Sequence, residues 1–132
     1  MGKETAVADD KKDDNILYVL SKGPEEPELA SIAFIHATGA LAMGVQARIV
    51  LLCDAVLFAK KDVARHVIHQ GKPPLDELMR EYFEFGGELY LCTACVTSRA
   101  FDYDKDLIPE ARFIAAARYT ELVLEANAVL NY

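Results

Sequence analysis

The stretch "GGELYLCTACVTSR", Gly86–Arg99, contains the pattern from which the rest of the chain can be interpreted. Within it, Glu88–Cys92 is a short apolar run of the kind that forms a buried strand. Small polar residues follow at once, and we expect Cys95 in the turn into the next helix or in its first turn. The stretch therefore predicts a strand-turn-helix unit with a Cys-x-x-Cys pair where the strand ends.

Other apolar runs along the chain have the same character, and helical segments lie between them. The helix expected at 27–43 has Pro27 in its first turn, and the segment 74–85 has the apolar spacing of an amphipathic helix. Strands that alternate with helices indicate an α/β fold, with a parallel sheet covered on both faces. The strands are expected at 15–20, 47–55, 88–92, 112–115 and 127–132. The helices are expected at 27–43, 60–70, 74–85 and 116–126.

The composition limits the class of protein. The chain has 132 residues, of which 52% are hydrophobic, and this is enough for one globular domain whose core needs no disulfide bonds. Residues 1–14 are rich in charge and lack an apolar run, so we expect a flexible charged tail followed by a single domain at 15–132. The net charge of −7 argues against nucleic acid as the main partner.

The N-terminus and the cysteines favour a cytoplasmic location. No apolar signal-peptide segment is visible near the first residue, and three cysteines do not suit a secreted disulfide framework. The segment Leu29–Ala47 carries no formal charge and is long enough to span a bilayer. Polar residues and small alanines dilute it, so we expect no membrane span but a helix buried on nearly all sides, between the sheet and a second subunit.

Polar and reactive residues follow each of the first three long strands. In a parallel sheet the carboxyl ends of the strands meet at one edge, and ligands bind there. We therefore expect the three cysteines to gather at that edge, with neighbouring residues as candidate substrate contacts. The cysteines are Cys53, Cys92 and Cys95, and the candidate contacts are Ser21, Lys22, Gly23, Asp54 and Arg99.

The Cys92/Cys95 pair could carry several chemistries. Backbone N–H groups at a helix start and the Arg99 guanidinium would lower a thiol pKa from ~8.5 by one or more units, which favours a nucleophilic thiolate. A thioredoxin-type dithiol is disfavoured because the pair follows the third strand and lacks the usual intervening residues. A structural zinc site needs four ligands, and only one such pair exists. We expect no metal and no cofactor, and for Cys53 a buried structural role is the simplest interpretation, and an accessory thiol is the alternative.

The order of these segments resembles the DsrE/DsrF-like family of sulfur-relay proteins. The resemblance covers roughly 15–132 and rests on "ILYVLSKGP", "RIVLLCDAVLFAKK", "GKPPLDELMREYFEFGGELYLCTACVTSRAF" and the terminal "NAVLNY". It implies a three-layer α/β/α sandwich with a mainly parallel sheet of about five strands, assembled as homotrimers or hexamers. It also implies cysteine-bound sulfur as a persulfide or related group, with TusA-type and rhodanese-type carriers as partners.

The resemblance assigns roles to some of the site residues. Cys92 matches the position of the family's reactive cysteine, after the third major strand. Cys95 is an additional thiol found in some members, which resemble a subgroup linked to thiosulfate or persulfide transfer. Asp54 stands in a loop where members often have glycine, and Cys53 matches no family role.

Three functions therefore remain for the structure to address. The first is a sulfur carrier or sulfurtransferase that loads a persulfide or thiosulfonate on Cys92 or Cys95. The second is a dithiol-disulfide oxidoreductase that uses the same pair. The third is a non-enzymatic assembly subunit with inert cysteines. The sequence leaves open which thiol receives sulfur first.

Overall fold

A five-stranded sheet forms the centre of the molecule, for which a computed structural model describes residues 14–132. Its strands are β1 (Asn15–Leu20), β2 (Gln46–Leu51), β3 (Glu88–Cys92), β4 (Ala111–Ile114) and β5 (Ala128–Asn131). They lie in the order β4-β3-β2-β1-β5, and every neighbouring pair is parallel. The predicted α/β class and the parallel sheet are confirmed.

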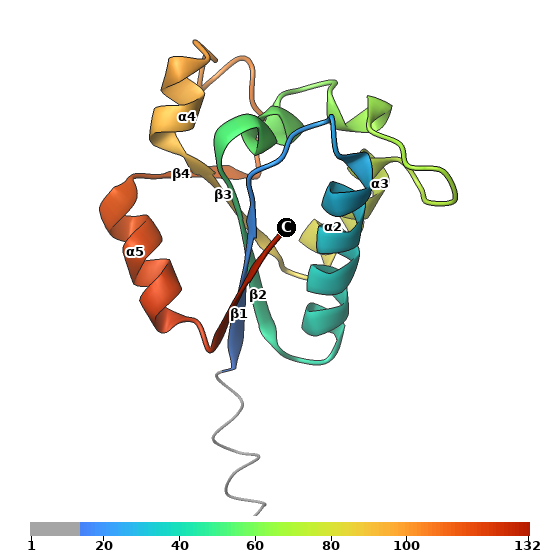
Figure 1. Ribbon diagram of the computed structural model, residues 1–132, viewed down its shortest axis with the longest axis vertical. Helices are drawn as coiled ribbons and strands as arrows, with labels where there is room; N and C mark the ends of the chain where they lie inside the picture. The colour runs from blue at the N-terminus through green and yellow to red at the C-terminus, as the bar shows by residue number, and fades with distance from the viewer. Residues whose placement is uncertain (1–13) are drawn as a thin grey trace, which may run out of the picture.

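Helices cover the sheet on both sides, which gives three layers (Figure 1). In that view α5 lies on one side of the sheet, α2 and α3 lie on the other, and α4 lies above. The helices are α2 (Pro27–Ala42), α3 (Leu75–Glu84), α4 (Thr93–Ser98) and α5 (Ala116–Glu125). The expected helices at 27–43, 74–85 and 116–126 are confirmed within one or two residues.

The two faces of the sheet bury cores of different size. The larger core lies under α2 and α3 and is centred on Phe34, Phe58 and Tyr82, which are fully buried. The smaller core lies under α5, where Leu122 packs with Val50 and other strand residues. Because both faces of the central strands are buried, these strands are continuous apolar runs rather than alternating ones. The three-layer fold thus follows from the burial of both faces of the sheet under helices.

The strand expected at 47–55 is shorter than predicted. β2 ends at Leu51, and a 3₁₀ helix, η2 (Cys53–Ala59), follows it. Cys53 has a φ of 53°, in the left-handed region, which a strand cannot continue through. Cys53 and Asp54 therefore begin the next element instead of closing the strand.

The prediction of a helix at 60–70 was wrong. Only the short 3₁₀ helix η3 (Ala64–His66) forms there. Asp62 has a left-handed φ of 70°, which interrupts helical backbone before this turn. After it the chain is extended at Val67, whose carbonyl accepts the N–H of Leu75 at 2.9 Å.

One face of α2 packs on the sheet while the other stays open in this chain. Ala33, Phe34 and Ala37 are fully buried, whereas Leu29 and Ile35 are each 38% exposed. None of the helices within residues 14–132 is both long and apolar enough to cross a membrane. The tail expected at 1–14 lies, except for Asp14, outside the described residues.

Candidate functional site

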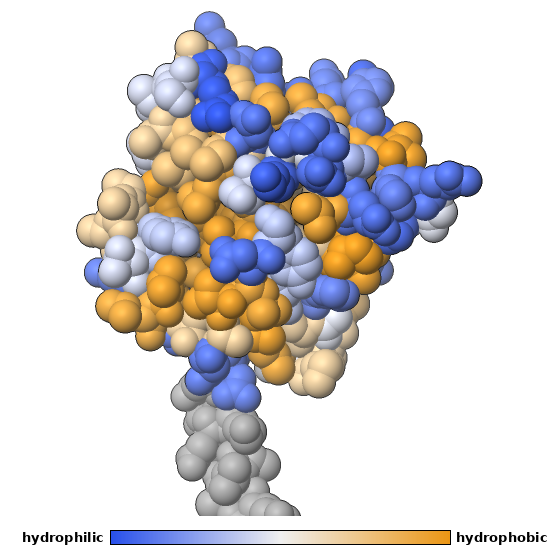
Figure 2. All heavy atoms as spheres, in the orientation of Figure 1, coloured by the Kyte–Doolittle hydropathy of each residue, from blue (hydrophilic) through white to orange (hydrophobic). Residues whose placement is uncertain are grey.

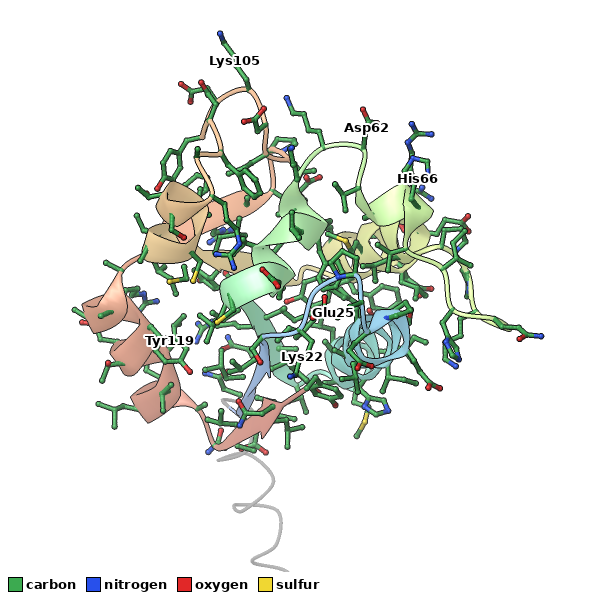
Figure 3. The ribbon with its side chains drawn as sticks, turned by 45° about the horizontal axis from the view of Figure 1, so that its top comes forward. Lys22, Glu25, Asp62, His66, Lys105 and Tyr119 are labelled. Carbon is green, nitrogen blue, oxygen red and sulfur yellow. The ribbon has the colours of Figure 1, made fainter. Side chains whose placement is uncertain are left out.

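The sheet brings the three cysteines to one edge, as predicted. Cys92 is the last residue of β3 and precedes the first turn of α4, in which Cys95 lies. β2 is the parallel neighbour of β3, with Leu51 opposite Leu91, so Cys53 emerges at the same carboxyl edge. Figure 3 shows yellow sulfur atoms gathered between α4 and the turn of η2.

A backbone hydrogen bond joins the two segments at this edge. The N–H of Cys53 donates to the Sγ of Cys95, with the nitrogen 3.1 Å from the sulfur. Cys95 and Cys92 are partly buried, whereas Cys53 is exposed. An N–H donor favours the charged form of the sulfur that accepts it. The arrangement therefore provides one fixed donor for a thiolate or a charged sulfur adduct on Cys95.

The environment of Cys95 does not lower its pKa, contrary to the expectation. Burial raises the pKa of the Cys95 thiol, and the hydrogen bond and charge of the Cys92 thiol raise it further. The Cys53 N–H acts in the opposite direction but is outweighed. Cys95 is thus mainly a neutral thiol near pH 7, because desolvation penalises the thiolate more than the single donor stabilises it.

Arg99 holds Asp54 rather than a cysteine sulfur. Its Nη2 lies 2.6 Å from the Oδ1 of Asp54, and its Nη1 donates to the carbonyl oxygen of Cys95 at 3.1 Å. The Asp54 carboxylate raises the pKa of Arg99, first through this hydrogen bond. The ion pair ties the end of α4 to the start of η2. We call it the Arg99–Asp54 bridge, and it keeps Cys95 beside Cys53.

The loop after β1 passes close to Asp54 at Gly23. A Cβ on Gly23 would lie 2.8 Å from the carbonyl oxygen of Asp54 and 2.9 Å from its Cβ, so only glycine fits without a shift. Ser21 and Lys22 are exposed on the same loop, and no hydrogen bond joins them to the cysteines within residues 14–132. Figure 3 labels Lys22 and Glu25 on this segment. Gly23 therefore positions Asp54, and a contact role for Ser21 and Lys22 stays a prediction.

The hydrogen-bond donor at the site is a backbone N–H group, which the pattern of side chains in the sequence does not reveal. The N–H of Cys53 points at Cys95 because Cys53 starts η2 with a left-handed φ. The sequence carries a partial signal, since opposite charges at Asp54 and Arg99 follow neighbouring strands. Thr93, also overlooked, donates its hydroxyl to the carbonyl of Ile114 at 2.9 Å and anchors α4 to β4.

One groove of the described region lies away from the cysteines. Its volume is about 500 Å³, and apolar side chains, including Phe58 and Met79, line it together with charged ones. No cysteine lines it. Among residues 14–132, no three His, Cys, Asp or Glu side chains gather in a way that could hold a metal ion. The cysteines thus lie outside this groove, at the carboxyl edge of the sheet, and Cys53 among them is exposed.

The raised pKa of Cys95 predicts how its reactivity depends on pH. Alkylation of Cys95 by iodoacetamide should rise with a midpoint above that of the same peptide in urea-denatured protein, because only the thiolate reacts. In the Cys92→Ala variant the midpoint should move down, since two influences that raise the pKa are gone. Peptide-resolved mass spectrometry across neutral and alkaline pH measures both midpoints. A folded-state midpoint at or below the denatured one would contradict this description.

Comparison with known proteins adds a family and a fold. The model of one protein family, the DsrE/DsrF-like family, matches residues 14–132. No curated protein matches the chain. The crystal structure of the YchN protein from E. coli is similar with a TM-score of 0.70 and 18% identity, over 90% of this chain and 99% of that one.

Two further structures are similar. A protein of unknown function, MTH1491 from Methanobacterium thermoautotrophicum, aligns with a TM-score of 0.70 and 14% identity, over 91% of this chain and 100% of that one. The BT1422 protein of unknown function from Bacteroides thetaiotaomicron aligns with a TM-score of 0.57 and 12% identity, over 90% and 95%. At these identities the neighbours show the shared fold.

Proposed function

We propose, because this chain belongs to the DsrE/DsrF-like family, that it is a sulfur carrier which binds a persulfide or thiosulfonate group on cysteine and passes it to a partner. The family is generally associated with sulfur relay. The observation that carries the proposal is the Cys95 sulfur, which accepts the Cys53 N–H at 3.1 Å beside two other thiols. These thiols lie outside the groove that Phe58 and Met79 line, and Cys53 is exposed to an approaching partner.

We assign the loading step to Cys95. Its thiolate attacks the outer sulfur of a persulfide donor, a new S–S bond forms, and the donor's own thiolate leaves with the electron pair of the broken bond. The product is a Cys95 persulfide, and the Cys53 N–H donates to the Cys95 sulfur that carries it. Cys92, the last residue of β3, stays nearby as a second, partly buried thiol. The reaction needs no oxidant and no cofactor.

The partners we propose have the chemistry of small thiol carriers. In the cytoplasm, a TusA-like or rhodanese-like protein would present its own cysteine to the three thiols of this chain. We also propose that the chain forms a homotrimer or hexamer. Apolar side chains are exposed on β5 and α5, with Leu130 41% and Leu124 79% exposed, and Figure 2 shows broad hydrophobic surface over these elements. Such surface is suited to burial against a second copy.

The Cys-x-x-Cys spacing of Cys92 and Cys95, with Cys95 in the first turn after Cys92, supports a second candidate, a dithiol oxidoreductase. Sulfur transfer to an acceptor protein distinguishes the sulfur carrier from the oxidoreductase. The protein is treated with a persulfide donor, freed of donor, and mixed with a TusA-like protein that has one cysteine. We expect the acceptor to gain the mass of one sulfur atom as this chain loses it. Loss of two hydrogens from this chain, with no gain in the acceptor, would support the oxidoreductase instead.

A further inference from the structure

Cys53 is the thiol that the loading step leaves unused, and its surroundings differ from those of the other two. It is exposed, whereas Cys92 and Cys95 are partly buried. Its backbone nitrogen is 3.1 Å from the Cys95 sulfur, and because the N–Cα bond is ~1.46 Å, its Cα lies within about 4.6 Å of that sulfur. The Cys53 side chain therefore begins close to the Cys95 sulfur.

We propose that Cys53 is the exit thiol of an internal relay. It takes the outer sulfur from Cys95 and presents it to the acceptor protein. This inference rests on the proposed function and adds the direction of transfer within the site. The sulfur enters at a partly buried thiol, where a donor N–H holds the adduct, and leaves from the exposed one.

The geometry suits such a transfer. A sulfur bonded to Cys95 projects a further ~2 Å beyond its Sγ. The Cys53 side chain is exposed, and its Cα lies beside that sulfur. The Arg99–Asp54 bridge holds the two segments together on the same side, since Asp54 directly follows Cys53 and Arg99 lies one turn after Cys95. No movement of the sheet is needed.

The step is a balanced exchange. The Cys53 thiolate attacks the outer sulfur of the Cys95 persulfide, one S–S bond forms at Cys53, and one breaks at Cys95. The electron pair of the broken bond stays on the Cys95 sulfur, which takes up a proton. The outer sulfur has moved and its oxidation state is unchanged. An acceptor thiolate then removes it from Cys53 in the same way.

The test measures the rate at which the loaded full-length protein transfers its sulfur to an acceptor. Native protein and the Cys53→Ser variant are loaded with inorganic polysulfide, and transfer per loaded molecule is followed to a small protein with one surface cysteine. The substitution retains the backbone N–H that faces Cys95. We expect transfer from Cys53→Ser to be roughly tenfold slower or more, because the acceptor must then reach a less accessible sulfur. Cyanide, which is small enough to reach a partly buried sulfur, should still remove it from both proteins.

Peptide mapping of the native protein at intermediate times gives the second readout, and we expect the added sulfur on Cys53 after it has appeared on Cys95. Transfer from Cys53→Ser at the native rate would overturn the relay. Release of sulfide with a Cys53–Cys95 disulfide would also overturn it. If the native protein takes up no sulfur at all, the proposed function itself fails; if it loads and transfers but Cys53→Ser matches it, only the relay fails.

Discussion

Cys95→Ser should sharply slow the uptake of sulfur from a persulfide or polysulfide donor. A serine hydroxyl is not ionised near neutral pH, so the attacking group is lost while the Cys53 N–H keeps a partner of similar size. The initial rate of loading should fall by about 10³-fold or more, the size of effect seen when a nucleophile is removed. Intact-mass spectrometry at short times after donor addition measures it.

Cys92→Ser is the matched control. Cys92 lies one turn earlier and is also partly buried, and the substitution makes the same change of sulfur to oxygen. We expect it to load at a rate within a few-fold of native, because Cys95 and its donor remain. Loading that survives Cys95→Ser but is lost in Cys92→Ser would transfer the loading role to Cys92, the position that the family resemblance indicates.

Gly87→Ala is the substitution we expect to damage the fold most. Gly87 lies between α3 and β3, and a Cβ there would overlap the ring of Tyr82. Tyr82 is fully buried, and its hydroxyl donates to the carbonyl oxygens of Ala47 and Glu88, so the ring has no space into which to move. Such overpacking should lower the free energy of unfolding by about 3 kcal/mol.

Gly39→Ala is the control for this prediction. Gly39 lies inside α2, and a Cβ there meets nothing within 4 Å. Alanine should raise the free energy of unfolding by about 0.5–1 kcal/mol, because glycine is a poor helix former. Urea unfolding followed by circular dichroism gives both values. Equal midpoints for Gly87→Ala and the native protein would contradict the overlap of a Gly87 Cβ with the Tyr82 ring.

The regular elements were predictable because their signals are local or repeat along the chain. Glu88–Cys92 was predicted with the bounds that the structure has, since an apolar run between a glycine pair and a polar turn leaves little choice. Asn15–Leu20 was predicted with the same accuracy. The alternation of strands and helices then indicated parallel pairing. Element type follows from composition and periodicity, and both are present in the sequence.

The errors fell where a single backbone angle decides the structure. The segment 49–59 is apolar except for Asp54, so nothing in its composition marks the end of β2 at Leu51. The left-handed φ values at Cys53 and Asp62 end one element and prevent another, at residues that do not usually adopt them. The same angle at Cys53 aims its N–H at Cys95.

The composition of the site was predictable, but its electrostatics were not. The carboxyl edge of a parallel sheet was enough to place all three cysteines together. The pKa of Cys95 depends on how deeply the thiol is buried and on the Cys92 thiol beside it, and neither is encoded in spacing. The pairing of Arg99 with Asp54 likewise depends on the turn that η2 makes after β2.

Transferable sulfur on this cysteine cluster should be visible in the intact mass of the native chain before and after a persulfide donor is added. We predict a product heavier by one sulfur atom or a small whole number of them, removed by a thiol reductant and missing when all three cysteines are replaced by serine. An unchanged mass after persulfide, thiosulfate and tetrathionate treatment, or the same adducts on the triple variant, would contradict a sulfur-carrying role for these cysteines.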